Sequence, residues 1–293
     1  DLPISAVPGY YNSDRFSKKA VNVGSLRNRG YEITIQSNNL QTKDLTWTTM
    51  LNFGHNHNEL TKIYGEENQI ISGVRIHKVG EPYYSYYGYE YAGVDPSTGR
   101  ESYYLNNGTS NARNTTINPN EAKKVIIGNH ETKIEGGFSN NITWKFIDFG
   151  LNFTFSLGGK AFDAATWQHN NGNYTFGGQL PTYYDINKMW TGPGDTNASQ
   201  PVFQYGNSSE VSSRWLMPTD YLRLKSLTLG FTAPSQWVTR IGLSKARAFF
   251  SASNLLTWKS KDLYVDPEMR VDGVCTFQTP ALRTFTFGIE LGF

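Results

Sequence analysis

The stretch ALRTFTFGIELGF, from Ala281 to Phe293, alternates between large apolar residues and small or polar ones. Successive side chains of an extended strand point to opposite faces of the sheet. One face of this strand therefore carries Phe285, Phe287, Ile289, Leu291 and Phe293, and the other carries Thr284, Thr286, Gly288, Glu290 and Gly292. An apolar outward face and a polar inward face are typical of a strand in an outer-membrane β-barrel. Soluble antiparallel sheets also alternate, so the argument depends on how often the pattern returns.

The same alternation returns in six upstream segments. The clearest is FGLNFTFSLGG, where Leu151, Phe153, Phe155 and Leu157 share one face and small polar residues share the other. In DYLRLKSLTLGF the alternation slips between Leu224 and Leu227, which predicts a β-bulge. The predicted strands before the terminal one are 31–36, 45–54, 134–144, 149–159, 220–231 and 250–258.

The connections between these strands differ in length. Short ones are predicted at 38–44 and 145–148, one of medium length at 233–244, and long polar ones at 55–131, 160–213 and 259–280. Bacterial outer-membrane barrels have short periplasmic turns, long extracellular loops and periplasmic termini. Counting back from Phe293 places all three long loops outside the cell, provided that a small hairpin expected within 83–105 adds an even number of strands.

Composition agrees with a barrel and excludes several other classes. The mean hydropathy is −0.50, and no run approaches the roughly 20 apolar residues that a spanning helix needs. The 18 Tyr, 17 Phe and 7 Trp could supply the aromatic girdles of a barrel. A net charge of +2 shows no nucleic-acid footprint. The single cysteine, Cys275, excludes an intramolecular disulfide framework and a multi-cysteine metal site.

Several segments, in order along nearly the whole chain, resemble SusC/RagA-type TonB-dependent outer-membrane transporters. Each motif is weak alone, but their order and spacing are specific. They are NVGSLRNRGYE (22–32), YYGY (86–89), GVDPSTG (93–99), WTGPGD (190–195), DYLRLK (220–225), NLLT (254–257), DPE (266–268) and the closing PALRTFTFG (280–288).

This resemblance implies an all-β fold, namely the carboxyl-terminal part of a transmembrane antiparallel barrel of about 22 strands with long extracellular loops. Residues 1–293 would then be one portion of the barrel domain, and the amino-terminal plug and the first strands would lie outside this chain. The implied function is active, TonB-energised import of an oligosaccharide or an oligopeptide across the outer membrane of a Bacteroidetes-type cell.

The resemblance also implies partners. A SusD-like surface lipoprotein would close over the barrel, and TonB with ExbB and ExbD would act through the missing amino-terminal region. Barrel-assembly machinery would read the terminal strand, whose last aromatic, Phe293, would be the assembly signal. No cofactor, metal or nucleic acid is expected. The choice between glycan and peptide cargo stays open.

Two sets of residues are predicted to carry function. Aromatic residues crowd the 160–213 loop and could contact the lid or cargo, because binding surfaces favour Tyr and Trp; they could equally pack the loop itself. These residues are Trp167, Tyr174, Tyr183, Tyr184 and Trp190. The residues predicted to face lipid are Leu151, Phe153, Phe155, Leu157, Phe285, Phe287, Ile289 and Leu291.

Two other functions fit the same strand pattern. They are a surface adhesin barrel without transport and a soluble carbohydrate-binding β-sandwich.

His55, His57 and Glu59 could share a strand face as metal ligands, but a closed site needs about four ligands and no fourth is evident. A glycosidase acid pair among Asp195, Asp220, Asp266 and Glu268 has no supporting spacing, and Asp beside Pro or Gly usually marks a turn. An enzyme is therefore not expected.

Overall fold

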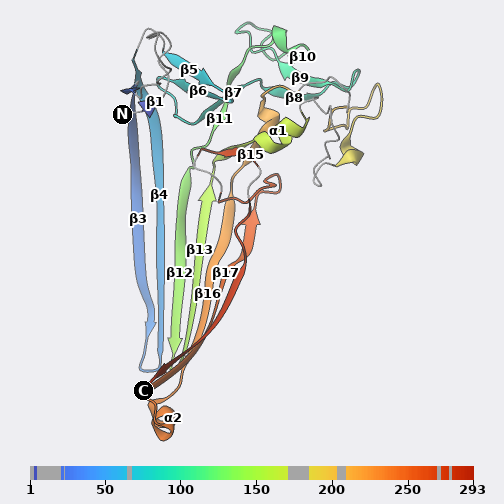
Figure 1. The fold of residues 1–293 in the computed structure, drawn as a ribbon. Helices are drawn as coiled ribbons and strands as arrows, with labels where there is room; N and C mark the ends of the chain where they lie inside the picture. The colour runs from blue at the N-terminus through green and yellow to red at the C-terminus, as the bar shows by residue number, and fades with distance from the viewer. Residues whose placement is uncertain are drawn as a thin grey trace, which may run out of the picture.

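A curved seven-stranded antiparallel sheet forms the body of the computed structural model (Figure 1). The structure describes residues 3–4, 21–22, 24–64, 68–170, 185–202, 209–268, 272–276 and 279–293. The order β19-β17-β16-β13-β12-β4-β3 follows the chain, so each strand pairs with the next one in this sheet. The strands are β3 (Gly24–Gln41), β4 (Leu45–Ile63), β12 (Ile134–Trp144), β13 (Ile147–Leu157), β16 (Tyr221–Thr232), β17 (Lys245–Lys259) and β19 (Thr284–Gly292).

All seven predicted strands are present, but the first two are longer than predicted. The ladder between β3 and β4 continues past the apolar residues, with Arg27 opposite Glu59 and Asn28 opposite Asn58. His55 and His57, which we assigned to a long loop, therefore lie in β4. The prediction stopped early because most residues of this extension are polar on both faces, so that no apolar alternation marks it, although Leu60 is buried. The connections at 38–44 and 145–148 shorten accordingly to 42–44 and 145–146.

The register gathers the apolar rows of all seven strands on one face. Phe138 lies opposite Leu51 on one side and Phe153 on the other. At the far edge, Phe250 lies between Leu229 and Phe287. On the opposite face the corresponding rows are polar, including Ser139, Asn152, Ser251 and Thr286. The sheet therefore has one continuous apolar face and one polar face.

The predicted slip in the fifth strand is a bulge at Lys225. Leu224 pairs with Phe153 and Ser226 pairs with Asn152, so Lys225 has no partner in that ladder. Leu227 follows Leu224 by three residues, so in a regular strand the two side chains would point to opposite faces. The bulge shifts the pleat by one residue and puts both on the apolar face. The bulge is the reason that an irregular sequence still contributes to an unbroken apolar face.

Smaller sheets gather at one end of the large sheet (Figure 1). We call them, together with α1 (Ala164–Asn170), the loop layer. They are β5 (Gln69–Ser72), β6 (Arg75–Lys78), β7 (Ser85–Gly88) and β11 (Val125–Asn129); β8 (Tyr91–Val94), β9 (Glu101–Tyr104) and β10 (Thr115–Thr116); and β14 (Lys160–Asp163), β15 (Leu216–Pro218) and β18 (Val274–Cys275). A separate strand pair is β1 (Pro3–Ile4) with β2 (Val21–Asn22), and three-residue 3-10 helices occupy Pro119–Glu121 (η1), Ile186–Lys188 (η2) and Ser213–Trp215 (η3).

The hairpin predicted within 83–105 is only partly correct. β8 and β9 pair as expected across the turn at Asp95. Its predicted first arm, however, divides between two sheets, because β7 pairs with β11 and β6. Neither of these two sheets adds a strand to the large sheet. The number of strands counted back from Phe293 is therefore unchanged, and so are the predicted sides of the loops.

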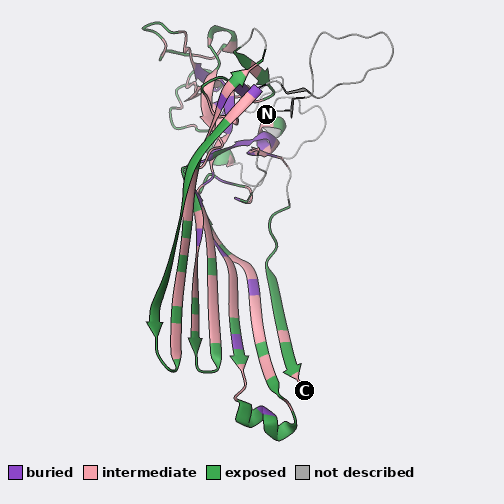
Figure 2. Ribbon diagram, turned by 90° about the vertical axis from the view of Figure 1, so that its left-hand side faces the viewer, coloured by how far each residue is buried: buried purple, intermediate pink, exposed green. Residues whose placement is uncertain are grey.

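Buried residues concentrate in the loop layer, whereas the large sheet is mostly exposed or half-buried (Figure 2). One apolar cluster contains Tyr86, Phe162, Ala164 and Trp215, and a second contains Ala161, Met217, Leu263 and Cys275. Domains in water bury the apolar face of a sheet against a second layer. In the described chain nothing covers the apolar face of the large sheet, which therefore requires an apolar environment.

The opposite end of the sheet carries the short connections. The one between β16 and β17 contains α2 (Ser235–Val238) and the 3-10 helix η4 (Thr239–Ile241), which project beyond the strand ends (Figure 1). Among the described residues no helix has the length and hydrophobicity to cross a membrane.

Candidate functional site

The three long connections fold together into the loop layer. β14 pairs antiparallel with β15 and parallel with β18, which joins the 160–213 and 259–280 segments in one sheet. The hydroxyl of Tyr86, from the 55–131 segment, donates to the carbonyl of Gly273 at 2.9 Å. Gly273 has φ +65°, a conformation that favours glycine, and a Cβ there would collide with Tyr86 and His130. The layer is therefore one packed body made from all three loops.

Trp167 lies in α1, inside this body. Its indole N–H donates to the carbonyl of Ser209 at 2.9 Å, and its ring meets Phe162 edge-on with centroids 5.8 Å apart. It packs against the cluster that contains Tyr86 and Trp215. In this position Trp167 contributes to the stability of the layer, and its contact with lid or cargo stays a prediction.

Trp190 joins two of the recognised motifs. Its indole N–H donates to the carbonyl of Pro96 at 3.0 Å, and its ring lies over Gly99, where φ is +70°. The N–H of Gly194 donates to the same carbonyl at 2.9 Å. The GVDPSTG and WTGPGD motifs therefore pack on each other. Tyr174, Tyr183 and Tyr184 lie outside the described residues, so any contact of theirs also stays a prediction.

Asp195 and Asp220 organise backbone in the structure. The carboxylate of Asp195 accepts from the backbone N–H groups of Thr191 and Asn197, and these donors lower its pKa. The carboxylate of Asp220 accepts from the backbone N–H of Gly158 at 2.5 Å. Asp195 therefore serves a turn, as expected from its Pro-Gly-Asp context, whereas Asp220 links the residue after β13 to the start of β16.

Asp266 and Glu268 form an ion-pair cluster with β16 that the sequence analysis missed. Arg223 lies on the polar face of β16 and is 2% exposed. Its guanidinium contacts Asp266 and Glu268 at 2.7 Å each, and its Nε donates to Thr257 at 3.1 Å. Lys225 adds a contact of 2.7 Å to Glu268. The cluster fixes the 259–280 segment onto the polar face of the sheet.

The environment of Asp266 explains how a half-buried carboxylate stays ionised. Burial by itself raises its pKa, but backbone donors at Glu268 and Ala281 together with Arg223 lower it more, so the pKa lies below the ordinary value. Opposite charges in the recognised motifs DYLRLK and DPE, 43 residues apart, were a usable signal for this pairing.

A second buried ion pair holds the loop layer together. Arg214 contacts Glu101, and both side chains are 11% exposed. Glu101 also accepts from the hydroxyls of Tyr103 at 2.6 Å and Ser209 at 2.8 Å. Burial and the neighbouring Glu101 raise the pKa of Tyr103, so its phenol remains a hydrogen-bond donor. The cluster joins β9 to the segment that leads into β15.

The three candidate metal ligands contact other partners. His57 Nδ1 lies 2.9 Å from Glu131 Oε2, and His55 Nδ1 lies 3.3 Å from the carbonyl of Thr132. Glu59 faces Arg27 across the β3–β4 ladder. Over the described part of the chain, no group of three or more His, Cys, Asp or Glu side chains is placed to hold a metal ion.

Burial of His77 predicts that the loop layer loses stability in acid. Its imidazole is buried, stacks on Tyr83 with centroids 4.3 Å apart and has Nδ1 3.0 Å from the carbonyl of Tyr83. Burial lowers its pKa more than this carbonyl raises it, and nearby Arg75 lowers it further. A depressed histidine pKa means that the unfolded chain binds the proton first, so stability is full above the ordinary pKa of about 6.5 and falls as the pH drops below it.

We expect hydrogen-exchange protection in β5, β6 and β7, corrected for intrinsic rates, to fall between pH 7 and pH 5 in the full-length protein. His77→Phe keeps the ring stacking and removes the titration, so it should flatten this dependence. The strands of the large sheet serve as the internal reference. Equal pH dependence in His77→Phe and the wild type would contradict the assignment.

A meander of antiparallel strands with one apolar face, one polar face and a layer of loops at one end is part of a transmembrane β-barrel. Comparison with known proteins narrows the class. No family model matches the chain. TonB-dependent receptor P3 of Formosa agariphila is 28% identical over 316 residues, covering 94% of this chain and 30% of that protein. TonB-dependent receptor SusC of Bacteroides thetaiotaomicron is 26% identical over 294 residues, covering 93% and 27%.

Solved structures agree with these relatives. The RagAB peptide transporter matches with a TM-score of 0.80 at 26% identity, covering 95% of this chain and 30% of that one. The RagAB peptide importer in its open-open state matches with a TM-score of 0.81 at 27% identity, covering 100% and 31%. The resemblance to SusC/RagA-type TonB-dependent transporters is thus confirmed, and the chain corresponds to part of such a barrel. It spans about 30% of the length of these relatives.

Proposed function

We propose that this chain forms part of the barrel of an active, TonB-energised importer in the outer membrane of a Bacteroidetes-type cell. The observation that carries the proposal is the combination of a one-layer sheet, apolar on one face and polar on the other, with a packed loop layer at one end. The matched proteins, which are named as receptors and transporters, support the same role. The proposed cargo is an oligopeptide or an oligosaccharide.

The apolar face fits the thickness of a bilayer. On β13 the apolar row runs from Ile147 to Leu157, ten steps that span roughly 33 Å of extended strand, or about 25 Å of height at a strand tilt of about 40°. The apolar band of an outer-membrane barrel is about 25 Å tall, with aromatic residues at both rims. Exposed aromatic residues lie near both ends of this row and its neighbours: Trp47, Trp144 and Trp237 at the turn end, and Tyr31 and Trp258 at the loop-layer end.

We therefore assign the predicted lipid-facing residues to the bilayer. The register puts Leu151, Phe153, Phe155 and Leu157 of β13 on the same face as Phe285, Phe287, Ile289 and Leu291 of β19. The four residues of β19 are all exposed. Exposed rows of this size are unfavourable in water and favourable in lipid.

The polar face supports a wet lumen. Arg247 of β17 forms a two-contact ion pair with Asp148 of β13, at 2.5 and 2.7 Å. β16 runs between these strands, and Gly230 on it leaves room because a Cβ there would collide with both side chains. Charged pairs inside a membrane protein lie in the bundle interior or a water-filled cavity rather than against lipid. This face would line the transport path and receive the plug.

The unpaired edges of the sheet support the proposal that this chain is one portion of a larger barrel, and the loop layer at one end supports the proposal of a lipoprotein partner. β3 and β19 are edge strands of the described sheet, and edges in lipid must be paired. Strands from the remainder of the full protein would pair with them, with a plug inside that TonB, ExbB and ExbD would act on. A SusD-like lipoprotein would lie over the loop layer, close to the aromatic residues of the 160–213 segment.

Uptake by cells that carry the full-length gene tests the importer. The probes are two fluorescent pools, one of oligopeptides and one of oligosaccharides, given to cells with and without TonB. We expect one pool to accumulate inside TonB-containing cells and to remain at the surface without TonB. Surface binding without accumulation in both strains would contradict import and favour the adhesin alternative.

Phe293 should matter for insertion. It directly follows β19 and is 94% exposed, so the fold itself gains little from it. Deleting it from the full-length protein should lower the amount in the outer membrane without changing the melting temperature of the protein that does insert. Phe146→Ser, another exposed aromatic at the turn end, is the matched control. An unchanged outer-membrane level would remove the assembly role.

A further inference from the structure

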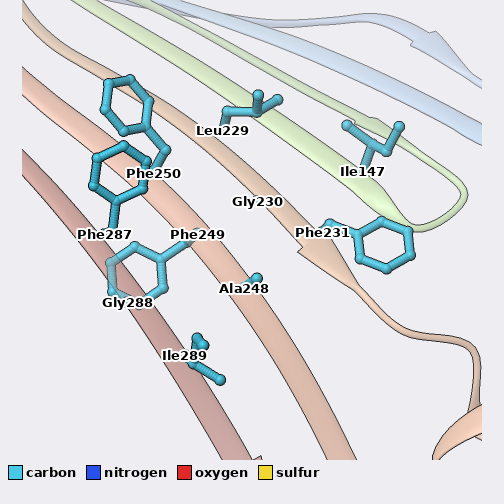
Figure 3. Close-up of a pocket in the computed structure, with 10 residues that line it drawn as sticks. All are labelled: Ile147, Leu229, Gly230, Phe231, Ala248, Phe249, Phe250, Phe287, Gly288 and Ile289. Atoms are coloured by element: carbon cyan, nitrogen blue, oxygen red, sulfur yellow. The ribbon is translucent and has the colours of Figure 1, made fainter.

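The apolar face carries a groove at the turn end of β16, β17 and β19. In the register, Leu229, Phe250 and Phe287 form one row across the three strands, and Phe231, Ala248 and Ile289 form the next. Ala248 is thus a small side chain with large apolar ones on neighbouring positions (Figure 3). The resulting groove has a volume of about 760 Å³ and is walled by Ile147, Leu229, Phe231, Phe250, Phe287 and Ile289.

The groove opens toward the connection that contains α2 and η4. Trp237 of α2 contacts Phe231 at the groove's end, with ring centroids 6.4 Å apart, and Trp237 is 59% exposed. Trp at this position is typical of the head-group level of a bilayer. The groove therefore lies at the depth of the acyl chains in the leaflet next to the periplasm.

The connection between β16 and β17 also contains a cation. Arg240 of η4 is exposed and has no carboxylate partner among the described residues. Lys245, the next cation along the chain, is by contrast paired with Glu290 at 2.7 Å. A guanidinium at head-group level is suited to bind a phosphate diester.

We propose that this groove is a binding site for one phospholipid of the inner leaflet. An acyl chain would lie over Ala248 between Phe231 and Phe250, and the head-group phosphate would meet Arg240. The occupant follows from the continuity of the groove with the lipid-facing surface, from the apolar side chains that wall it and from Arg240 in the adjacent β16–β17 connection, which has no carboxylate partner among the described residues. The inference rests on the membrane embedding proposed above.

Native mass spectrometry of the full-length protein tests the site. The protein is purified in neutral detergent and given phosphatidylethanolamine with one palmitoyl and one oleoyl chain. We expect the wild type to retain one phospholipid and Ala248→Phe, which fills the groove, to retain about tenfold less, equivalent to losing contact with about two methylene groups. Ala248→Val fills it in part and should be intermediate. Leu151→Phe adds bulk to the same face outside the groove and should match the wild type.

A second arm tests the head-group contact. Arg240→Gln should lower retention of phosphatidylethanolamine but leave retention of the matched diacylglycerol, which has no phosphate, unchanged. Equal lipid retention in the wild type, Ala248→Val and Ala248→Phe would overturn the site. The site would also be overturned if the wild type retained no lipid and Ala248→Phe changed the number of protein copies per particle. The groove would then bind a second copy of the protein. A chain that never inserts into the outer membrane would instead contradict the proposed embedding.

Discussion

Replacing Arg223 with Met should release the 259–280 segment from the polar face of the sheet and cost about 3–5 kcal/mol, the usual result of removing one partner from a buried ion pair. Asp266 and Glu268 would then lie half-buried without their main cation. Asp266 would still accept the backbone N–H groups of Glu268 and Ala281, so the segment should loosen rather than unfold completely.

Thermal unfolding of the full-length protein in detergent, together with proteolysis of the 259–280 segment, measures this effect. Lys225→Met is the control, because that side chain is 41% exposed and its contact to Glu268 should contribute at most about 1 kcal/mol. Adding Asp266→Asn and Glu268→Gln to Arg223→Met should restore part of the loss, since the unpaired charges disappear. A melting temperature in Arg223→Met equal to that of Lys225→Met would show that the cluster does not hold the segment.

Arg at Phe153 should have the second large effect. Phe153 lies on the apolar face and stacks on Phe138 with centroids 4.5 Å apart. A charged side chain near the bilayer midplane costs about 2–4 kcal/mol in barrels of this kind. Thr154, its neighbour on β13, lies on the polar face opposite Arg223, next to the ion-pair cluster with Asp266 and Glu268.

The pair Phe153→Arg and Thr154→Arg therefore separates the two faces at one depth. Folded protein recovered from the outer membrane and its unfolding free energy in lipid vesicles are the measurements. We expect a strong loss for Phe153→Arg and a smaller one for Thr154→Arg, which meets repulsion from Arg223 but has the carboxylates of Asp266 and Glu268 nearby instead of lipid. Equal losses on the two faces would contradict the assignment of lipid and lumen.

The large sheet could be predicted from sequence because the residues of each strand alternate according to what lies on the two faces of that strand. Lipid on one side and water on the other impose a period of two, which is visible in any single strand, such as residues 149–157. Even the bulge at Lys225 was visible, as a slip in that period. The extension of β4 beyond Gly54 was not visible, because its residues are mostly polar on both faces and leave no periodic signal.

The loop layer could not be predicted because its contacts join residues far apart in the chain. The hydrogen bond from Tyr86 to Gly273 spans 187 residues, and that from Trp190 to Pro96 spans 94. Their local sequences show turns and aromatic residues but not which loops meet. The pairing of Arg223 with Asp266 was within reach, because both lie in recognised motifs of opposite charge.

The central claim is that this sheet crosses the outer membrane with the loop layer outside and α2 in the periplasm. Labelling of single cysteines on intact cells with an impermeant maleimide tests it most directly, in the full-length protein with Cys275→Ser as background. Ser110→Cys and Thr196→Cys are exposed positions of the loop-layer end, and Gln236→Cys is an exposed position in α2. The account predicts that the first two label on intact cells and that Gln236→Cys labels only after lysis. Labelling of Gln236→Cys on intact cells, with Ser110→Cys and Thr196→Cys silent until lysis, would contradict it.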